Sequence, residues 1–202
     1  MLKLLGRQTS GNVQKVIFML EELAVPYLRE DYGRQFNNTQ TPAYKALNPN
    51  GKVPTLVDGA TVIWESNTIL RYLAAVHKPA LAGASPAERS EVERWMDWLL
   101  ASLNTPYVAV FKDGKKPAAE RAPDFAAQAK ELGDQLRIAD GQLQKRDWFA
   151  LQRLTVADIA LGPVLKRCLG FDIERQPTPN LDRWLKALED RPAFSTATGP
   201  AP

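Results

Sequence analysis

The sequence predicts an α+β fold, with a small four-stranded mixed sheet and two helices first and helices alone afterwards. Two observations carry this prediction. Residues 1–76 alternate short strand-like and helix-like segments, whereas from Pro86 onward only helical periodicity remains. A connection containing proline and glycine, residues 78–85, separates the two patterns. We therefore expect a first domain at 1–77, a linker at 78–85 and a helical domain at 86–202.

The first domain is expected to open with a strand, a helix and a second strand. Leu2 to Leu5 form a short apolar run before a polar turn, as strands do. Apolar residues then recur at helical spacing from Val13 to Leu23, and Pro26 marks the end of that segment. Residues 27–31 supply the next strand. A crossover helix between two strands predicts a parallel pair.

A hairpin and a covering helix are expected to complete this sheet after a loop. The strands at 53–57 and 61–64 flank Asp58-Gly59, a pair that suits a type I′ turn. Ser66 can cap the helix that follows, whose apolar residues recur at helical spacing up to Val76. The order in the first domain is therefore βαβ-ββα.

The second half carries four apolar stripes at helical spacing. They begin near Val92, Phe125, Thr155 and Leu181. Thr155 and Asp158 have the spacing of a capping box, which starts a helix and serves folding. A bundle of helices is expected from this pattern.

Composition excludes several classes of function. The 202 residues carry a net charge of +3 without a block of basic residues, so no nucleic-acid partner is expected. One cysteine and one histidine cannot build the usual zinc site or an internal disulfide, so no metal is expected. The apolar runs are too short to span a membrane, and Leu4-Leu5 runs directly into Gly6-Arg7-Gln8 without a signal-peptide pattern. We expect a soluble, cytoplasmic protein.

Two motifs give the sequence a specific resemblance. Residues 48–56 read NPNGKVPTL and residues 64–73 read WESNTILRYL, with the predicted hairpin between them. In this combination, and with weaker matches at 155–158 and 191–194, the chain resembles the glutathione transferase family, in its bacterial serine-type, theta-, nu- or phi-like branches. The resemblance implies a thioredoxin-like domain that binds glutathione, followed by the helical domain.

The resemblance also implies how glutathione is held. The Val53-Pro54 bond is expected to be cis, which exposes the Val53 backbone N–H and C=O to the cysteinyl backbone of glutathione. Glu65 and Ser66 are expected to bind the γ-glutamyl amine and carboxylate, although Ser66 also suits a simple helix cap. Lys52 is expected near the glycyl carboxylate, with a solvated loop lysine as the alternative.

The turn before the first helix is expected to stabilise the glutathione thiolate. By family position Ser10 donates to the sulfur, Asn12 assists and Thr9 is the rival hydroxyl. A hydroxyl and a helix N-terminus both lower a thiol pKa, which is about 8.5 for a free cysteine. From the residues alone, a helix cap is the favoured role of Ser10. No cysteine occurs in this turn, so a glutaredoxin-like covalent route is not expected.

The second substrate and the partner subunit are also taken from family position. Arg7, Tyr107, Val108 and Phe111 are the candidates for an electrophile site. A homodimer is expected, with Asp97 as the candidate contact to the glutathione of the neighbouring subunit.

The predicted function is a glutathione transferase active in detoxification, with glutathione as co-substrate and a small electrophile as the second substrate. Two alternatives remain on the same fold. One is a glutathione-dependent disulfide reductase or peroxidase, because Ser10-Gly11-Asn12 resembles a turn that some such proteins use. The other is a non-catalytic interaction module, since a fold does not fix a function.

Overall fold

The computed structural model describes residues 1–199, which divide into two compact units. The first unit contains Met1–Ala82 together with residues 189–199, and the second contains Gly83–Leu188. The break after Ala82 falls inside the predicted linker. The segment from Glu189 differs from the sequence-based domain assignment, which placed it with the helical domain.

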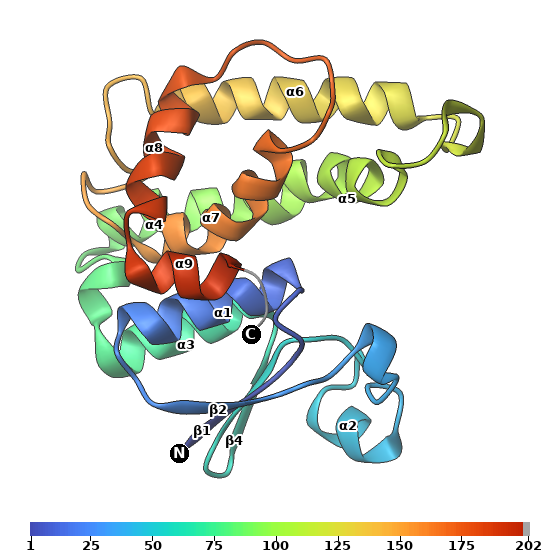
Figure 1. Ribbon diagram of the computed structural model, residues 1–202. Helices are drawn as coiled ribbons and strands as arrows, with labels where there is room; N and C mark the ends of the chain where they lie inside the picture. Colours follow the sequence, from blue (N-terminus) through green and yellow to red (C-terminus); the bar gives the residue numbers. More distant parts are fainter. Residues whose placement is uncertain (200–202) are drawn as a thin grey trace. The chain divides into compact units, whose positions relative to one another are not determined.

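The first unit contains the predicted sheet, in the strand order β2-β1-β3-β4. Its strands are β1 (Leu2–Leu5), β2 (Tyr27–Glu30), β3 (Thr55–Asp58) and β4 (Thr61–Trp64). Strand β1 pairs in parallel with β2 and antiparallel with β3, which pairs antiparallel with β4. The predicted α+β class and βαβ-ββα order are confirmed (Figure 1).

The helices of this unit are α1 (Gly11–Glu22), α2 (Pro42–Leu47), α3 (Ser66–His77) and α9 (Pro192–Thr198). Helices α1 and α3 pack side by side over the sheet (Figure 1). Eight consecutive residues of α1, Val13–Leu20, are buried, so this helix forms the centre of the unit.

Helix α9 packs on α1 in the first unit. The rings of Phe18 and Phe194 meet edge to face with centroids 5.1 Å apart, and both side chains are fully buried. Arg191 forms an ion pair with Glu22 of α1. These contacts explain why the C-terminal segment groups with the sheet.

Three local expectations for this unit need correction. The segment expected as a loop contains α2 and a 3-10 turn at Arg34–Phe36. The hairpin turn is Gly59-Ala60, and only Gly59 has a positive φ, so the type I′ prediction is wrong. Ser66 is the first residue of α3 rather than its cap, because Glu65, at φ 66°, occupies the cap position.

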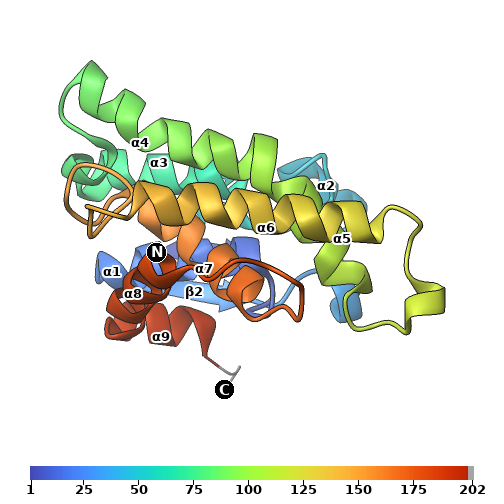
Figure 2. The ribbon, with the colours of Figure 1, turned by 90° about the horizontal axis from the view of Figure 1, so that it is seen from above.

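The second unit is helical, as predicted. It consists of α4 (Pro86–Trp98), a π-helical turn (Leu99–Leu103), α5 (Asn104–Asp113), α6 (Phe125–Gln142), α7 (Val156–Leu169) and most of α8 (Pro179–Glu189). Figure 2 shows α5 alongside α6, which it contacts. No helix among residues 1–199 is both long enough and apolar enough to cross a membrane.

The core of the second unit is built around Asp158, which is fully buried in the first turn of α7. Its carboxylate accepts hydrogen bonds from the backbone N–H groups of Phe149 and Thr155, both 3.0 Å away, from the Thr155 hydroxyl at 2.9 Å, and from the Trp184 indole at 3.0 Å. Burial raises the pKa of Asp158 to about 6, and these donors oppose the shift. The predicted capping box is confirmed, and it also fastens α8 and the 149 segment to α7.

Candidate functional site

The N-terminus of α1 opens onto a cavity of about 270 Å³ in the first unit. Nine residues line it: Arg7, Ser10, Asn12, Gly33, Arg34, Thr39, Gly51, Lys52 and Val53. Five of these, Arg7, Ser10, Asn12, Lys52 and Val53, were predicted from the sequence. Thr9 does not line the cavity, and its side chain is exposed.

The Ser10 hydroxyl has two possible roles, as a cap of α1 or as a donor to a ligand in the cavity. It occupies the N-cap position of α1, yet its side chain makes no capping hydrogen bond. Among residues 1–199 no other hydrogen bond of this hydroxyl is found either. Ser10 is 8% exposed and lines the cavity, so its hydroxyl is available to a ligand beside the positive end of the helix dipole.

The Val53 backbone is the second available group. The Val53-Pro54 bond is cis, as the resemblance implied. Neither the N–H nor the C=O of Val53 is hydrogen-bonded to any residue that the structure describes. Unpaired backbone groups of this kind are suited to pair with an extended peptide.

Two residues to which no role was assigned from the sequence, Tyr44 and Asn48, hold the loop before Val53 by hydrogen bonds. The Tyr44 hydroxyl donates to the Lys52 carbonyl at 2.7 Å, and Asn48 Nδ2 donates to the same oxygen at 2.9 Å. Both side chains also contact Thr55 Oγ1, at 2.9 and 3.1 Å. This network fixes where Lys52 and Val53 stand. Asn48 belonged to the recognised motif, but Tyr44 carried no sequence signal because its partner lies eight residues away.

Gly51 is required by the turn that this loop makes. Its φ is +59°, and a Cβ atom there would stand 2.6 Å from Gln40 Nε2, which donates to the Gly51 carbonyl at 3.2 Å. A side chain would therefore both strain the backbone and displace Gln40.

The start of α3 adjoins this site. The Ser66 hydroxyl donates to Asn12 Oδ1 at 3.4 Å, and the Glu65 carboxylate is 3.5 Å from Asn50 Nδ2. Ser66 is buried whereas Glu65 is exposed. The N–H groups in the first turn of a helix have no intrahelical acceptor, so this end of α3 is suited to a carboxylate.

A buried lysine lies under the same region. Lys15 of α1 is 1% exposed, and it makes no hydrogen bond or ion pair with any residue that the structure describes. Burial lowers the pKa of Lys15 to about 7, and the nearby charge of Glu65 opposes this shift. The burial of Lys15 was not predicted from the sequence.

The other predicted residues lie in the second unit. Tyr107, Val108 and Phe111 are on α5, where the Tyr107 ring lies 5.9 Å from that of Phe111 and 6.1 Å from that of Phe171, measured between centroids. Asp97 is exposed on α4. Within the described residues no group of three potential metal ligands occurs.

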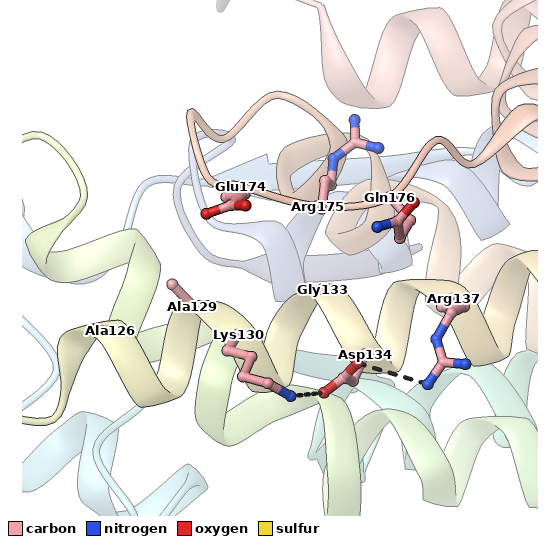
Figure 3. A pocket seen from close by; sticks show the side chains of 9 residues that line it. All are labelled: Ala126, Ala129, Lys130, Gly133, Asp134, Arg137, Glu174, Arg175 and Gln176. Atoms are coloured by element: carbon pink, nitrogen blue, oxygen red, sulfur yellow. Dashed lines mark hydrogen bonds and ion pairs between the residues drawn. The ribbon is translucent and has the colours of Figure 1, made fainter.

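A separate hollow of about 620 Å³ lies between α6 and the 174–176 segment (Figure 3). None of the predicted site residues lines it. Asp134 pairs with Lys130 at 2.7 Å and with Arg137 at 3.6 Å. The charged side chains that α6 contributes to this hollow therefore pair with one another.

Two family models cover most of the chain. The model of the glutathione S-transferase N-terminal domain matches residues 9–76, and that of the C-terminal domain matches residues 96–192. The chain belongs to the glutathione S-transferase family. Its predicted family resemblance is confirmed.

Individual relatives agree with this membership. Glutathione S-transferase GstB of Escherichia coli K12 is 37% identical over 96% of this chain and 95% of its own length. The solved structure of a theta class glutathione S-transferase from Xanthomonas axonopodis pv. citri, with glutathione bound, is 40% identical, has a TM-score of 0.92, and is matched over 99% of this chain and 98% of that one. FtsZ-localized protein A of Caulobacter vibrioides is 32% identical over 76% of this chain and 72% of its own length.

Proposed function

We propose that this member of the family is a glutathione transferase that activates the glutathione thiol for attack on small electrophiles. The observation that carries the proposal is the Ser10 hydroxyl, which lines the cavity at the N-terminus of α1 and makes no hydrogen bond within the described residues. The theta class relative whose structure contains glutathione supports the same function.

The proposed role of Ser10 is to donate a hydrogen bond to the glutathione sulfur. The donor and the α1 dipole both favour the thiolate over the thiol, and the thiolate is the nucleophile. Asn12, which lines the same cavity, is proposed to assist. Thr9, exposed and outside the cavity lining, is the weaker candidate.

Glutathione itself is held by backbone and charge. The Val53 N–H and C=O pair with its cysteinyl backbone beside Pro54, and Lys52 faces its glycyl carboxylate. The Ser66 hydroxyl and the backbone N–H groups in the first turn of α3 donate to the γ-glutamyl carboxylate, and the Glu65 carboxylate accepts from the γ-glutamyl ammonium. These contacts hold the glutathione sulfur ionised and in a fixed orientation, which favours its reaction with an electrophile.

The decisive experiment measures the thiol pKa of bound glutathione from the ultraviolet absorbance of its thiolate. The pKa is expected below that of free glutathione in the wild-type protein and in Thr9→Ala, and higher in Ser10→Ala than in either, because the hydroxyl donor is lost and only the helix dipole remains. An unshifted pKa in the wild type would overturn the proposal.

The two other functions make different predictions. A disulfide reductase would turn over a glutathione-reducible disulfide faster than an aromatic halide. It would have to use the glutathione sulfur, because the chain's one cysteine, Cys168, is buried and burial raises its pKa. An interaction module would not be retained on immobilised glutathione.

The second substrate is proposed to contact Tyr107, Val108 and Phe111 on α5. Arg7, the remaining candidate, lines the cavity at the N-terminus of α1. We also propose a cytoplasmic homodimer, active in detoxification, in which Asp97 reaches the glutathione of the partner subunit. Exposed apolar side chains on β4, Val62 at 36% and Trp64 at 37%, support an interface there. Light scattering after size exclusion tests the dimer.

A further inference from the structure

A second cavity, of about 520 Å³, lies wholly in the second unit where α5 and α7 end. Its apolar walls are Val110 and Phe111 from α5 and Phe171, which follows α7. This volume is within the range of sites that bind small organic molecules.

Both aromatic wall residues also contact a third aromatic ring, that of Tyr107. The Tyr107 ring is nearly parallel to that of Phe171, at an interplanar angle of 22°, and is tilted by 40° to that of Phe111. Phe111 is nevertheless 37% exposed, so part of its side chain remains open to a ligand at the cavity. A planar ring packed against this exposed part would bury apolar surface and gain an aromatic contact.

More basic than acidic residues line this cavity. Lys115 and Arg167 are basic, and Asp172 is the single acid. The Arg167 guanidinium lies 5.8 Å from the centre of the Phe111 ring, so it stays beside the aromatic wall. Lys115 is exposed and forms no ion pair or hydrogen bond with any residue from 1 to 199.

We propose that this cavity binds an aromatic compound that carries a negative charge, with its ring against Phe111 and Phe171 and its anion facing Lys115 and Arg167. The inference rests on the proposed function in one respect, because it makes an anionic aryl electrophile the preferred second substrate. Binding itself does not depend on that function.

Binding is tested first with unreactive probes. Calorimetry compares 3-nitrobenzoate with its neutral counterpart 3-nitrobenzamide, and with cyclohexanecarboxylate, which has the charge without the aromatic ring. The nitrobenzoate is expected to bind about fivefold more tightly than the amide, as one or two solvent-accessible ion pairs allow. It is also expected to bind about fivefold more tightly than cyclohexanecarboxylate, because only its ring makes aromatic contacts with Phe111 and Phe171. Equal affinities, or no binding of the nitrobenzoate, would overturn the proposal.

Variants separate the charge from the cavity. Lys115→Ala combined with Arg167→Gln is expected to abolish the preference for the carboxylate and leave the affinity for the amide unchanged. Lys145→Ala, which removes an exposed lysine away from the cavity lining, is the matched control. A preference that survives in the double variant would contradict the assignment of the two cations.

Gly170 allows the cavity to be filled without changing its charge. A Cβ atom at this position would meet nothing closer than 3.6 Å, and its φ of −87° suits any residue. Gly170→Leu is expected to weaken both aromatic probes at least about fivefold, since a leucine occupies the space of the ring. Unchanged binding in a variant with a native circular dichroism melt would place the probe elsewhere.

Turnover then distinguishes this inference from the proposed function. With 4-chloro-3-nitrobenzoate the glutathione thiolate forms a C–S bond, chloride leaves with the C–Cl electron pair, and the thiol proton passes to solvent. Rates for this acid and its amide are each divided by their uncatalysed rates, and the acid is expected to be favoured. Selective binding of the carboxylate without turnover would support the proposed ligand of this cavity and contradict the proposed transferase function. Turnover of both compounds without a preference for the acid would support the transferase function and contradict the proposed ligand.

Discussion

The Ser66 hydroxyl donates to Asn12 Oδ1 at 3.4 Å and so joins the start of α3 to the start of α1 across 54 positions of sequence. The cavity at the α1 N-terminus contains Asn12, whereas Ser66 belongs to the helix end suited to a carboxylate. One contact therefore links the part of the site proposed for the sulfur with the part proposed for the γ-glutamyl group.

Ser66→Ala is expected to raise the KM for glutathione about tenfold with a smaller change in kcat, because it removes a group that binds the ground state and the transition state alike. Steady-state kinetics with varied glutathione measures the effect. Ser90→Ala, at an exposed position on α4, is the control. A large fall in kcat with an unchanged KM would contradict this division of roles.

Ser10→Ala is expected to lower kcat/KM about a hundredfold, the usual loss when one hydrogen-bond donor to a developing or stabilised anion is removed. Thr9→Ala should change it less than about threefold, in keeping with a minor effect. The comparison is made at a fixed pH near neutrality with one aromatic halide. A greater loss in the threonine variant would reverse the assignment.

Tyr44→Phe tests the support beneath the Lys52-Val53 backbone. The variant removes the hydroxyl that donates to the Lys52 carbonyl and is expected to raise the KM for glutathione several-fold and to lower the free energy of unfolding by about 1 kcal/mol. Tyr72→Phe removes a hydroxyl that binds Asp58 at 2.7 Å, on the hairpin, and should affect stability alone. Equal KM values in the two variants would show that the loop holds its place without Tyr44.

The sequence predicted those parts of the site that depend on short motifs. Ser10, Asn12, Lys52 and Val53 line one cavity, as the family resemblance implied from the turn before the first helix and from the motif at 48–56. The cap of α3 was missed by one residue, because the positive φ of Glu65 is a tertiary feature without a sequence signal.

Long-range packing could not be predicted in the same way. The grouping of α9 with the sheet depends on Phe18–Phe194 and Glu22–Arg191, pairs separated by most of the chain. Apolar spacing reveals that a helix has a buried face but not which helix covers it. The burial of Lys15 was missed for the same reason.

Asp158→Asn is expected to lower the free energy of unfolding by about 3 kcal/mol, because the amide N–H₂ would face donors where the carboxylate now accepts hydrogen bonds from Phe149, Thr155 and Trp184. Urea unfolding followed by tryptophan fluorescence measures this loss. Asp134→Asn on the exposed face of α6 should cost less than about 1 kcal/mol. A cost at Asp158 as small as this would show that the buried network contributes little.

Lys15→Met tests the cost of a buried ammonium group. The pKa of Lys15 is about 7 in the folded protein, against 10.5 for an unperturbed lysine, so between these values the unfolded state binds more protons. The stability of the wild type should therefore rise with pH relative to the variant, by about 2 kcal/mol from pH 7 to pH 9, since one pKa unit corresponds to about 1.4 kcal/mol.

The variant should be more stable than the wild type throughout this range, and its advantage should be greatest below pH 7 and shrink as the pH approaches 10.5. Denaturant unfolding at several pH values measures both proteins, with Lys45→Met at an exposed position as the control. Every titrating group except Lys15 is common to the wild type and Lys15→Met, so the difference between these two profiles isolates Lys15. Parallel profiles would mean that the ammonium group keeps its hydration or a compensating charge in the folded protein, and that its burial does not oppose folding.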